Sequence, residues 1–300
     1  MSSPFPDRLA ALVEERRSQV VLGLDPDPAA LWPAALAEEH DPDGDPAVRA
    51  AAAVARHCLL AIEAAGPACV AVKLQLACFE RLGAPGWAAL KSTVAAARDR
   101  GLLVIADGKR GDVPVTAGAY GQALVGETPS PFGAVPGLGA DAFTANPLLG
   151  RDSLEPLVEA ARATGSGVFV LVRTSNPGAA DLQDTGEPPV YERLARLADE
   201  LGKGALSDVG AVCGATRPEH LARLRELMPR APFLMPGVGT QGGSAEALGA
   251  AFAPGPAAGL ITASRSIVGA HRERGGDPAA AAAAAASELR DAGWRTAQAS

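Results

Sequence analysis

The stretch LLVIADGKRGD, residues 102–112, contains the pattern on which our prediction of the fold rests. Its first half is continuously apolar, and charged residues follow at once: Asp107, Lys109, Arg110 and Asp112. A short apolar run without polar alternation predicts a β-strand that is buried on both faces. The charges then mark the carboxyl end of that strand, where a parallel barrel presents its functional side chains.

Similar apolar runs recur along the whole chain, and segments with helical periodicity lie between most of them. Strands that alternate with helices predict a parallel sheet covered by helices. Eight such runs fit an α/β protein of the (β/α)8 or TIM-barrel type, and an open doubly wound sheet is the alternative. The runs are QVVLGL (19–24), CVAVKL (69–74), LLVIAD (102–107), ADAFTA (140–145), GVFVLVRT (167–174), VGAVCGA (209–215), PFLMPGV (232–238) and GLITASR (259–265).

We expect residues 1–300 to form one barrel domain. Two polar segments rich in glycine or proline, 38–46 and 126–139, interrupt the alternation. Strand–helix alternation resumes after each of them, so we interpret them as loops rather than domain linkers. The alanine-rich segment near the carboxyl end predicts a terminal helix over about 277–294, packed on the outside of the barrel.

The composition is that of a soluble globular protein, with 48% hydrophobic residues and a formal net charge of −7. The acidic balance argues against a nucleic-acid partner, because such binding needs a basic face. We find neither a signal-peptide pattern nor a membrane-spanning run, and expect no membrane partner and a cytoplasmic location. The cysteines lie in apolar segments without C-x-x-C spacing, which predicts buried thiols: Cys58, Cys69, Cys78 and Cys213.

Lysine is scarce in this chain, because almost all of its basic residues are arginine. Where arginine provides the general surface charge, a retained lysine points to a need for a compact, titratable ammonium group. Lys73 and Lys109 lie in apolar contexts, whereas Lys91 and Lys203 are typical of exposed positions. We therefore take Lys73 and Lys109 as candidates for a functional role.

Four charges fall at the ends of two successive predicted strands. Asp107 and Lys109 are two residues apart, so a regular strand would project them to the same face. Lys73 ends the preceding strand, and Asp112 lies just beyond Lys109. Such a cluster is costly in an apolar site unless its members pair with one another. A purely structural ion-pair network is the alternative, but the position at barrel strand ends favours a catalytic role.

The segment PGVGTQGG (236–243) matches the G-x-G-x-x-G pattern of dinucleotide-binding folds. It follows the seventh strand rather than the first, and no acidic residue follows at the required spacing. We interpret it as a phosphate-binding loop in which Gly239, Gly242 and Gln241 act together with Arg265 after the eighth strand. An ordinary glycine turn beside a surface arginine is the alternative.

Taken together, these segments resemble the orotidine 5′-phosphate decarboxylase family, in particular its longer bacterial subgroup, over most of the chain. Asp107, Lys109 and Asp112 match the D-x-K-x-x-D signature of that family, and Thr116 follows at the family's spacing. The other matching segments are GLDPDP with Asp25, VKLQLACFE with Lys73, RTSNPG with Ser175 and Asn176, and PGVGTQGG followed by Ser264–Arg265.

The resemblance implies conversion of orotidine 5′-monophosphate to UMP and CO2 without a metal, a cofactor or a covalent intermediate. It places Asp107 near the substrate carboxylate. It implies that Lys109 stabilises the carbanion that develops at C6 and then protonates it. Lys73 and Asp25 would hold the ribose hydroxyls.

The resemblance also implies a homodimer with shared active sites, in which Asp112 and Thr116 come from the partner subunit. Ser175 and Asn176 would contact the pyrimidine. The loop around Gln241 would close over the substrate phosphate.

Two other functions remain open at the level of the sequence. One is a metal-dependent sugar-phosphate decarboxylase or aldolase of the same superfamily, in which the second strand typically ends in an acid. This chain has Lys73 there, and a lysine would repel a metal ion. The other is a non-catalytic barrel that binds nucleotide phosphates and uses the charges only for structure.

Overall fold

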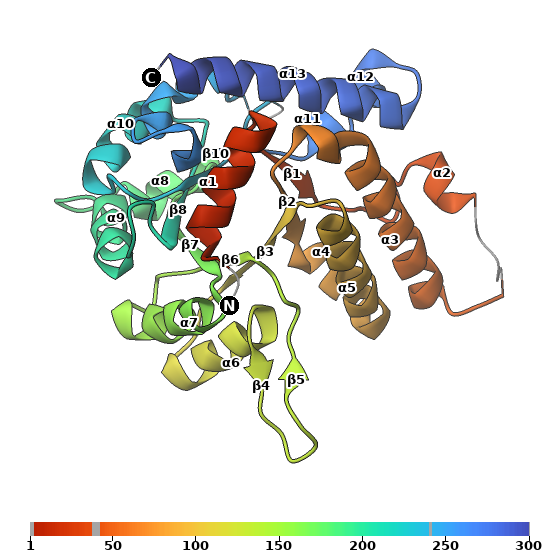
Figure 1. Ribbon diagram of the computed structural model, residues 1–300, viewed down its shortest axis with the longest axis horizontal. Helices are drawn as coiled ribbons and strands as arrows, with labels where there is room; N and C mark the ends of the chain where they lie inside the picture. The colour runs from red at the N-terminus through yellow and green to blue at the C-terminus, as the bar shows by residue number, and fades with distance from the viewer. Residues whose placement is uncertain (1–2, 38–42, 240–241, 300) are drawn as a thin grey trace.

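The computed structural model describes residues 3–37, 43–239 and 242–299, and these residues form a closed barrel of eight parallel strands (Figure 1). The residues of β1 pair with both β2 and β10, so the ring has no open edge. The predicted barrel is confirmed, and the open doubly wound sheet is wrong. Around the barrel the strands are β1 (Val20–Leu24), β10 (Gly259–Ala263), β9 (Phe233–Pro236), β8 (Val209–Cys213), β7 (Gly167–Arg173), β6 (Ala142–Ala145), β3 (Leu103–Arg110) and β2 (Ala71–Gln75).

Helices cover the outside of the barrel, as the apolar outer faces of its strands require. None of the described helices is long and apolar enough to cross a membrane. The α-helices are α1 (Phe5–Arg16), α2 (Pro33–Leu36), α3 (Pro46–Ala65), α4 (Leu76–Glu80), α5 (Gly83–Asp99), α6 (Pro114–Leu124), α7 (Arg151–Thr164), α8 (Ala180–Gln183), α9 (Val190–Leu201), α10 (Pro218–Leu227), α11 (Arg265–Val268), α12 (His271–Arg274) and α13 (Pro278–Gln298). Short 3-10 helices are η1 (Gly66–Ala68), η2 (Pro177–Ala179), η3 (Ala245–Phe252) and η4 (Pro256–Ala258).

Helix α1 closes the end of the barrel at which the strands begin. Its residues Phe5, Leu9 and Val13 are buried in one apolar cluster with side chains from inside the barrel. The ring of Phe5 meets the ring of Phe169 edge to face, with centroids 5.9 Å apart. The sealed amino end leaves the carboxyl ends of the strands as the open face of the barrel.

Two segments lie outside the β/α repeat. Helix α13 lies along one side of the molecule, next to α11 and α12 (Figure 1). The connection 126–139 contains a short antiparallel pair, β4 (Glu127–Thr128) and β5 (Val135–Pro136), which projects away from the barrel (Figure 1). Most of the predicted loop 38–46 lies outside the described residues.

Shortening the side chain of Leu9 should destabilise the barrel without touching its open face. The Leu9→Ala variant should lose about 2–5 kcal/mol of the free energy of unfolding, because a fully buried leucine leaves a cavity. Urea unfolding followed by circular dichroism measures this. Glu14→Ala, at an exposed position of the same helix, is the control and should change stability by less than about 0.5 kcal/mol. Equal stability of the two variants would show that α1 does not stabilise the barrel.

Candidate active site

A buried carboxylate joins two lysines at the open end of the barrel. The Nζ atom of Lys73, on β2, lies 2.6 Å from Oδ2 of Asp107 on β3. The Nζ atom of Lys109 lies 2.7 Å from the other oxygen, Oδ1. Asp25, just after β1, extends the chain of charges, with its Oδ1 atom 3.6 Å from Nζ of Lys73. Charges therefore alternate in sign from Asp25 to Lys109.

Thr144, at the end of β6, fixes both partners of one of these ion pairs. Its hydroxyl donates a hydrogen bond to Oδ1 of Asp107 at 2.9 Å. The Oγ1 atom of Thr144 in turn accepts the backbone N–H of Lys109 at 2.8 Å. Gln75 adds a longer contact of 3.4 Å to Oδ2 of Asp107. Thr144 was not among the site residues predicted from the sequence. The one feature of the sequence that pointed to it is its position at the end of the fourth predicted strand.

The backbone at Lys109 differs from the expectation of a regular strand. Lys109 has a left-handed conformation, with φ of 48°, and the pairing of β3 with β6 changes register between Ala106 and Arg110. Asp107 and Lys109 do point to the same site, as predicted, but a left-handed backbone at Lys109 rather than regular strand alternation brings them together. A left-handed conformation costs a residue with a Cβ about 1–2 kcal/mol. Strain of this kind is typical of functional sites.

Both buried members of the cluster are held in their charged forms. Burial on its own would raise the pKa of the Asp107 carboxyl, but the ammonium groups of Lys73 and Lys109 outweigh it and lower that pKa to about 2. Burial on its own would lower the pKa of Lys73, but Asp107 and Asp25 outweigh it and raise that pKa above its usual value. Asp107 is only 5% exposed, so the site keeps a full negative charge almost out of contact with water.

Arg110 anchors the end of β3 on the side opposite the cavity residues. Its guanidinium pairs with Glu80 at the end of α4 and lies over the ring of Tyr120, 5.4 Å from the centroid. A Cβ atom on Gly111 would lie 2.7 Å from the carbonyl oxygen of Asn146, so only glycine fits at that position. These contacts fix the strand end that carries Asp107 and Lys109.

The charged cluster borders a cavity of about 370 Å³ at the open end of the barrel. Seven of the predicted site residues line it together: Asp25, Lys73, Asp107, Lys109, Ser175, Asn176 and Arg265. Thr144, Gln75, Thr174 and Thr262 also line it, and the sequence analysis had not included them in the site. The cavity thus combines a charged wall, a polar loop and a guanidinium.

The loop with Ser175 and Asn176 is fastened to the barrel by a buried arginine. Arg173, at the end of β7, makes two hydrogen bonds to the carboxylate of Asp184, at 2.7 and 3.0 Å. The side chain of Arg173 also lowers the pKa of Asp184. The backbone N–H of Thr174 donates to Gln183 at 2.8 Å. Ser175 and Asn176 are therefore presented by a loop that is tied at both ends.

In the predicted phosphate loop, the backbone amides of Gly239 and Gly242 donate to carbonyl groups of the loop itself. The N–H of Gly239 donates to the carbonyl of Gly243, and the N–H of Gly242 donates to that of Gly239. These amides can bind an anion only after the loop rearranges, so their role stays a prediction. Gln241 lies outside the described residues. Arg265 has no ion pair with any residue that the structure describes, and its exposed guanidinium is available to an anion.

Asp112 and Thr116 do not line the cavity of their own chain. Asp112 accepts the N–H of the next residue, Val113, at 2.7 Å. Thr116 is exposed on the first turn of α6. Their position outside the cavity is compatible with a role in the active site of a partner subunit, which stays a prediction.

The geometry defines a class of protein: a TIM-barrel enzyme with a charged catalytic cavity. A carboxylate locked in its ionised form beside a partly exposed ammonium can stabilise charge that develops on a bound molecule and can deliver a proton. A free guanidinium at the opposite wall can hold an anionic group.

The chain belongs to the orotidine 5′-phosphate decarboxylase / HUMPS family, whose model matches residues 18–285. It is 42% identical to the orotidine 5′-phosphate decarboxylase of Deinococcus radiodurans over 283 residues, covering 91% of this chain and 94% of that protein. It is 43% identical to the orotidine 5′-phosphate decarboxylase of Haloarcula marismortui, over 88% of this chain and 86% of that one. The structure of Leishmania donovani OMP decarboxylase is similar with a TM-score of 0.72 and 33% identity, over 97% and 99% of the two chains.

Replacing Thr144 by valine should slow the decarboxylation step. Valine has nearly the same shape but removes the bond to Asp107 and leaves the N–H of Lys109 without an acceptor. Hydrogen bonds to charged groups contribute about 1.5–3 kcal/mol, so kcat should fall roughly 10- to 100-fold, with a smaller change in KM. Initial rates with orotidine 5′-monophosphate measure this. Thr144→Ser keeps the hydroxyl and should retain most of the activity, and an unimpaired Thr144→Val variant would contradict the role.

Proposed function

We propose that this chain decarboxylates orotidine 5′-monophosphate to UMP, the last step in forming a pyrimidine nucleotide. The observation that carries the proposal is the ionised, buried Asp107 held between Lys73 and Lys109 on the wall of the cavity. The names of the curated relatives support the same reaction.

In the proposed reaction, Asp107 lies beside the substrate carboxylate and Lys109 beside C6. The bond between C6 and the carboxylate carbon breaks, CO2 leaves, and the electron pair remains on C6. The ammonium of Lys109 stabilises this charge and transfers a proton to C6, and solvent then returns a proton to its Nζ atom. Arginine could not replace it, because a guanidinium holds its proton too firmly.

The remaining cavity residues would hold the substrate in place. Lys73 and Asp25 would bind the ribose hydroxyls, and Ser175 and Asn176 would contact the pyrimidine. The 5′-phosphate would lie against Arg265 and the loop that contains Gly239, Gln241 and Gly242. Binding the phosphate far from C6 supplies energy that can be used to close the loop and orient the base.

The charges of the cluster disfavour the metal-dependent sugar-phosphate enzymes of the superfamily. Each oxygen of Asp107 already accepts from an ammonium group, Lys73 on one side and Lys109 on the other. A divalent cation at this carboxylate would have to displace one lysine and would be repelled by the other. The activity and UMP-binding measurements on the unaltered protein and on Lys109→Ala distinguish a decarboxylase from a non-catalytic barrel that binds nucleotides.

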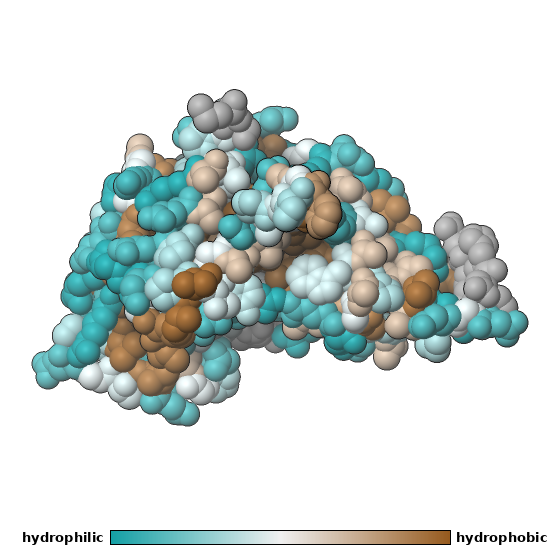
Figure 2. Space-filling view, turned by 90° about the horizontal axis from the view of Figure 1, so that it is seen from below, coloured by the Kyte–Doolittle hydropathy of each residue, from teal (hydrophilic) through white to brown (hydrophobic). Residues whose placement is uncertain are grey.

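We propose that two copies of the chain form a homodimer and that Asp112 and Thr116 complete the partner's active site. Large apolar side chains are exposed beside them: Val113 on the loop after β3 with Val115 at the start of α6, and Leu148 and Leu149 on the loop after β6. The two loops are neighbours, since the N–H of Asn146 donates to the carbonyl of Arg110 at 2.8 Å. Figure 2 views the molecule from the side on which the hairpin β4–β5 projects, and apolar side chains gather there between hydrophilic regions.

We further propose that residues 1–300 act as one barrel domain in the cytoplasm. Helix α13 packs against the barrel, where a Cβ atom on Gly293 would lie 2.6 Å from Ile261 of β10. All four cysteines are free thiols, which suits a reducing compartment. The acidic net charge of −7 supports the absence of a nucleic-acid partner.

Removing the amine of Lys109 should abolish catalysis and spare nucleotide binding. The Lys109→Ala variant should lose at least about 1,000-fold in kcat, since the proton donor and its charge are both lost. Ultraviolet absorbance of the orotate chromophore in excess EDTA measures the rate, and calorimetry measures UMP binding. Lys109→Arg should restore the charge but not the rate.

The matched control is Lys91→Ala, at an exposed position on α5, which should behave as the unaltered protein. If the unaltered protein binds UMP but does not consume orotidine 5′-monophosphate, the decarboxylase proposal is contradicted and a non-catalytic nucleotide-binding function is favoured. Activity that disappears in EDTA would instead favour the metal-dependent enzymes.

A charge placed at Val115 should separate the proposed dimer. Val115 is 89% exposed in the single chain, and a glutamate there would be buried against the partner. We expect Val115→Glu to elute as a monomer in size-exclusion chromatography and to lose at least about 100-fold in activity, because each site would lack Asp112 and Thr116. Leu36→Glu on α2 changes another exposed apolar residue in the same way. It is the control and should remain dimeric and active. A fully active monomer would contradict shared active sites.

A further inference from the structure

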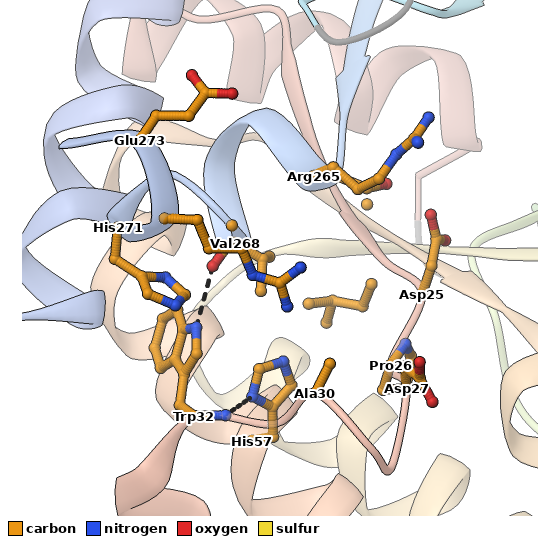
Figure 3. Close-up of a pocket in the computed structure, with 15 residues that line it drawn as sticks. Asp25, Pro26, Asp27, Ala30, Trp32, His57, Arg265, Val268, His271 and Glu273 are labelled. Carbon is orange, nitrogen blue, oxygen red and sulfur yellow. Dashed lines mark hydrogen bonds between the residues drawn. The ribbon is translucent and has the colours of Figure 1, made fainter. Parts of the chain in front are cut away.

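A second cavity lies beside the catalytic one and has no part in the proposed reaction. Its volume is about 390 Å³, close to that of the catalytic cavity. Its walls come from the loop after β1, from α3, and from α11 and α12 (Figure 3). Asp25, Ser264 and Arg265 line both cavities, so the two are neighbours across the start of α11.

A buried histidine presents a hydrogen-bond donor to this second cavity. The Nδ1 atom of His57 accepts the backbone N–H of Trp32 at 3.1 Å, so the neutral ring carries its proton on Nε2. In Figure 3 this second nitrogen points away from Trp32 and into the space between the labelled residues. His57 is only 4% exposed, yet its Nε2–H donates to no residue that the structure describes. The Nε2 atom itself is not fully enclosed, so a ligand or water in the cavity can reach this donor and accept from it.

His57 keeps this arrangement over the physiological pH range. Burial, together with the nearby His271 and Arg272, lowers the pKa of His57 to about 4. The ring is therefore neutral near pH 7, with one fixed acceptor and one fixed donor. Trp32 helps to fix it, because its indole N–H is itself bonded to the carbonyl of Val268 at 3.0 Å.

Two guanidinium groups border the same cavity, and neither is neutralised. The guanidinium groups of Arg265 and Arg272 make no ion pair or hydrogen bond with any part of the chain that the structure describes. By contrast Arg274, on the same short helix as Arg272, is paired with Glu288 at 2.6 Å. Unpaired arginines beside a buried N–H donor match an oxyanion that can accept several hydrogen bonds.

The acidic side chains of the cavity wall are engaged or point elsewhere. Asp25 pairs with Lys73 of the catalytic cluster. Asp27 accepts from Arg81 and from the backbone N–H of Ala29. The carboxylate of Glu273 points away from the cavity in Figure 3. Among the described residues of the cavity wall, His57, Arg265 and Arg272 therefore keep donors that can face a ligand.

We propose that this second cavity binds a phosphate group, either free phosphate or the phosphate of a small monoester. His57 and Arg272 would hold the anion, and Arg265 would be shared with the catalytic cavity. An anion in the second cavity would then draw Arg265 away from the substrate phosphate. Phosphate bound there would weaken substrate binding without entering the catalytic cavity.

The test uses the full chain with its catalytic cavity occupied by saturating UMP, and titrates inorganic phosphate by calorimetry. We expect one further equivalent of phosphate to bind, more weakly than to the chain without UMP, because UMP then engages the shared Arg265. Arg272→Ala should weaken this binding about tenfold or more, as expected for the loss of a charge-assisted hydrogen bond. Arg274→Ala, two residues along on the same helix, should leave it unchanged. His57→Asn, which keeps an acceptor for Trp32 but lacks the Nε2–H donor, should weaken phosphate binding as well.

A second titration with UMP beyond saturation separates the two sources of phosphate. A second equivalent of UMP that is lost in Arg272→Ala would identify a monoester site, and binding of inorganic phosphate alone would identify a site for the free anion. Binding of neither, or equal binding by the Arg272→Ala and Arg274→Ala variants, would overturn the proposal. If the protein does not bind UMP, the proposed function fails, and the phosphate titration of the free chain still tests the second site.

Discussion

The pairing of one carboxylate with two ammonium groups is the interaction on which the site depends. Asp107 is buried, and an isolated charge at such a position would be neutralised or expelled. Lys73 and Lys109 each contact a different oxygen of this carboxylate, and Thr144 adds a third bond. The charge is therefore fixed in place before a substrate arrives, which is the arrangement that electrostatic catalysis requires.

The barrel makes this pairing possible because it brings the ends of strands that are distant in the sequence to one face. Lys73, Asp107 and Thr144 are on β2, β3 and β6, which are neighbours in the ring although far apart in sequence. The amino end is closed by α1, so the carboxyl ends of the strands form the face that stays open to a ligand. Stability and chemistry are thus separated between the two ends, as is typical of this fold.

The strands and the charged residues of the site could be predicted from the sequence, but the backbone conformation and the contacts of those residues could not. Apolar runs ended by charges located β2 and β3 within a few residues, because burial on both faces leaves a clear pattern. The left-handed backbone at Lys109 left no such pattern, since it results from the register change between β3 and β6. The position of Thr144 at a predicted strand end was too weak a signal to assign a role, because that role depends on its distance to Asp107. Helix α1 was missed as a barrel closure because its partners come from all around the ring.

Arg265 lines both cavities, so its guanidinium must stay free of permanent ion pairs if it is to bind an anion in either one. A guanidinium committed to a permanent ion pair could not bind a substrate phosphate, and Arg265 has none among the described residues. The same freedom leaves it accessible from the second cavity, whose other donors, on His57 and Arg272, are fixed or nearby. Under the two proposals one arginine would serve both anions, and its single positive charge would be divided between them, so we expect occupation of either cavity to weaken binding in the other. The position of Arg265 between the two cavities is thus the structural basis of the proposed coupling, for a monoester and for a free anion alike.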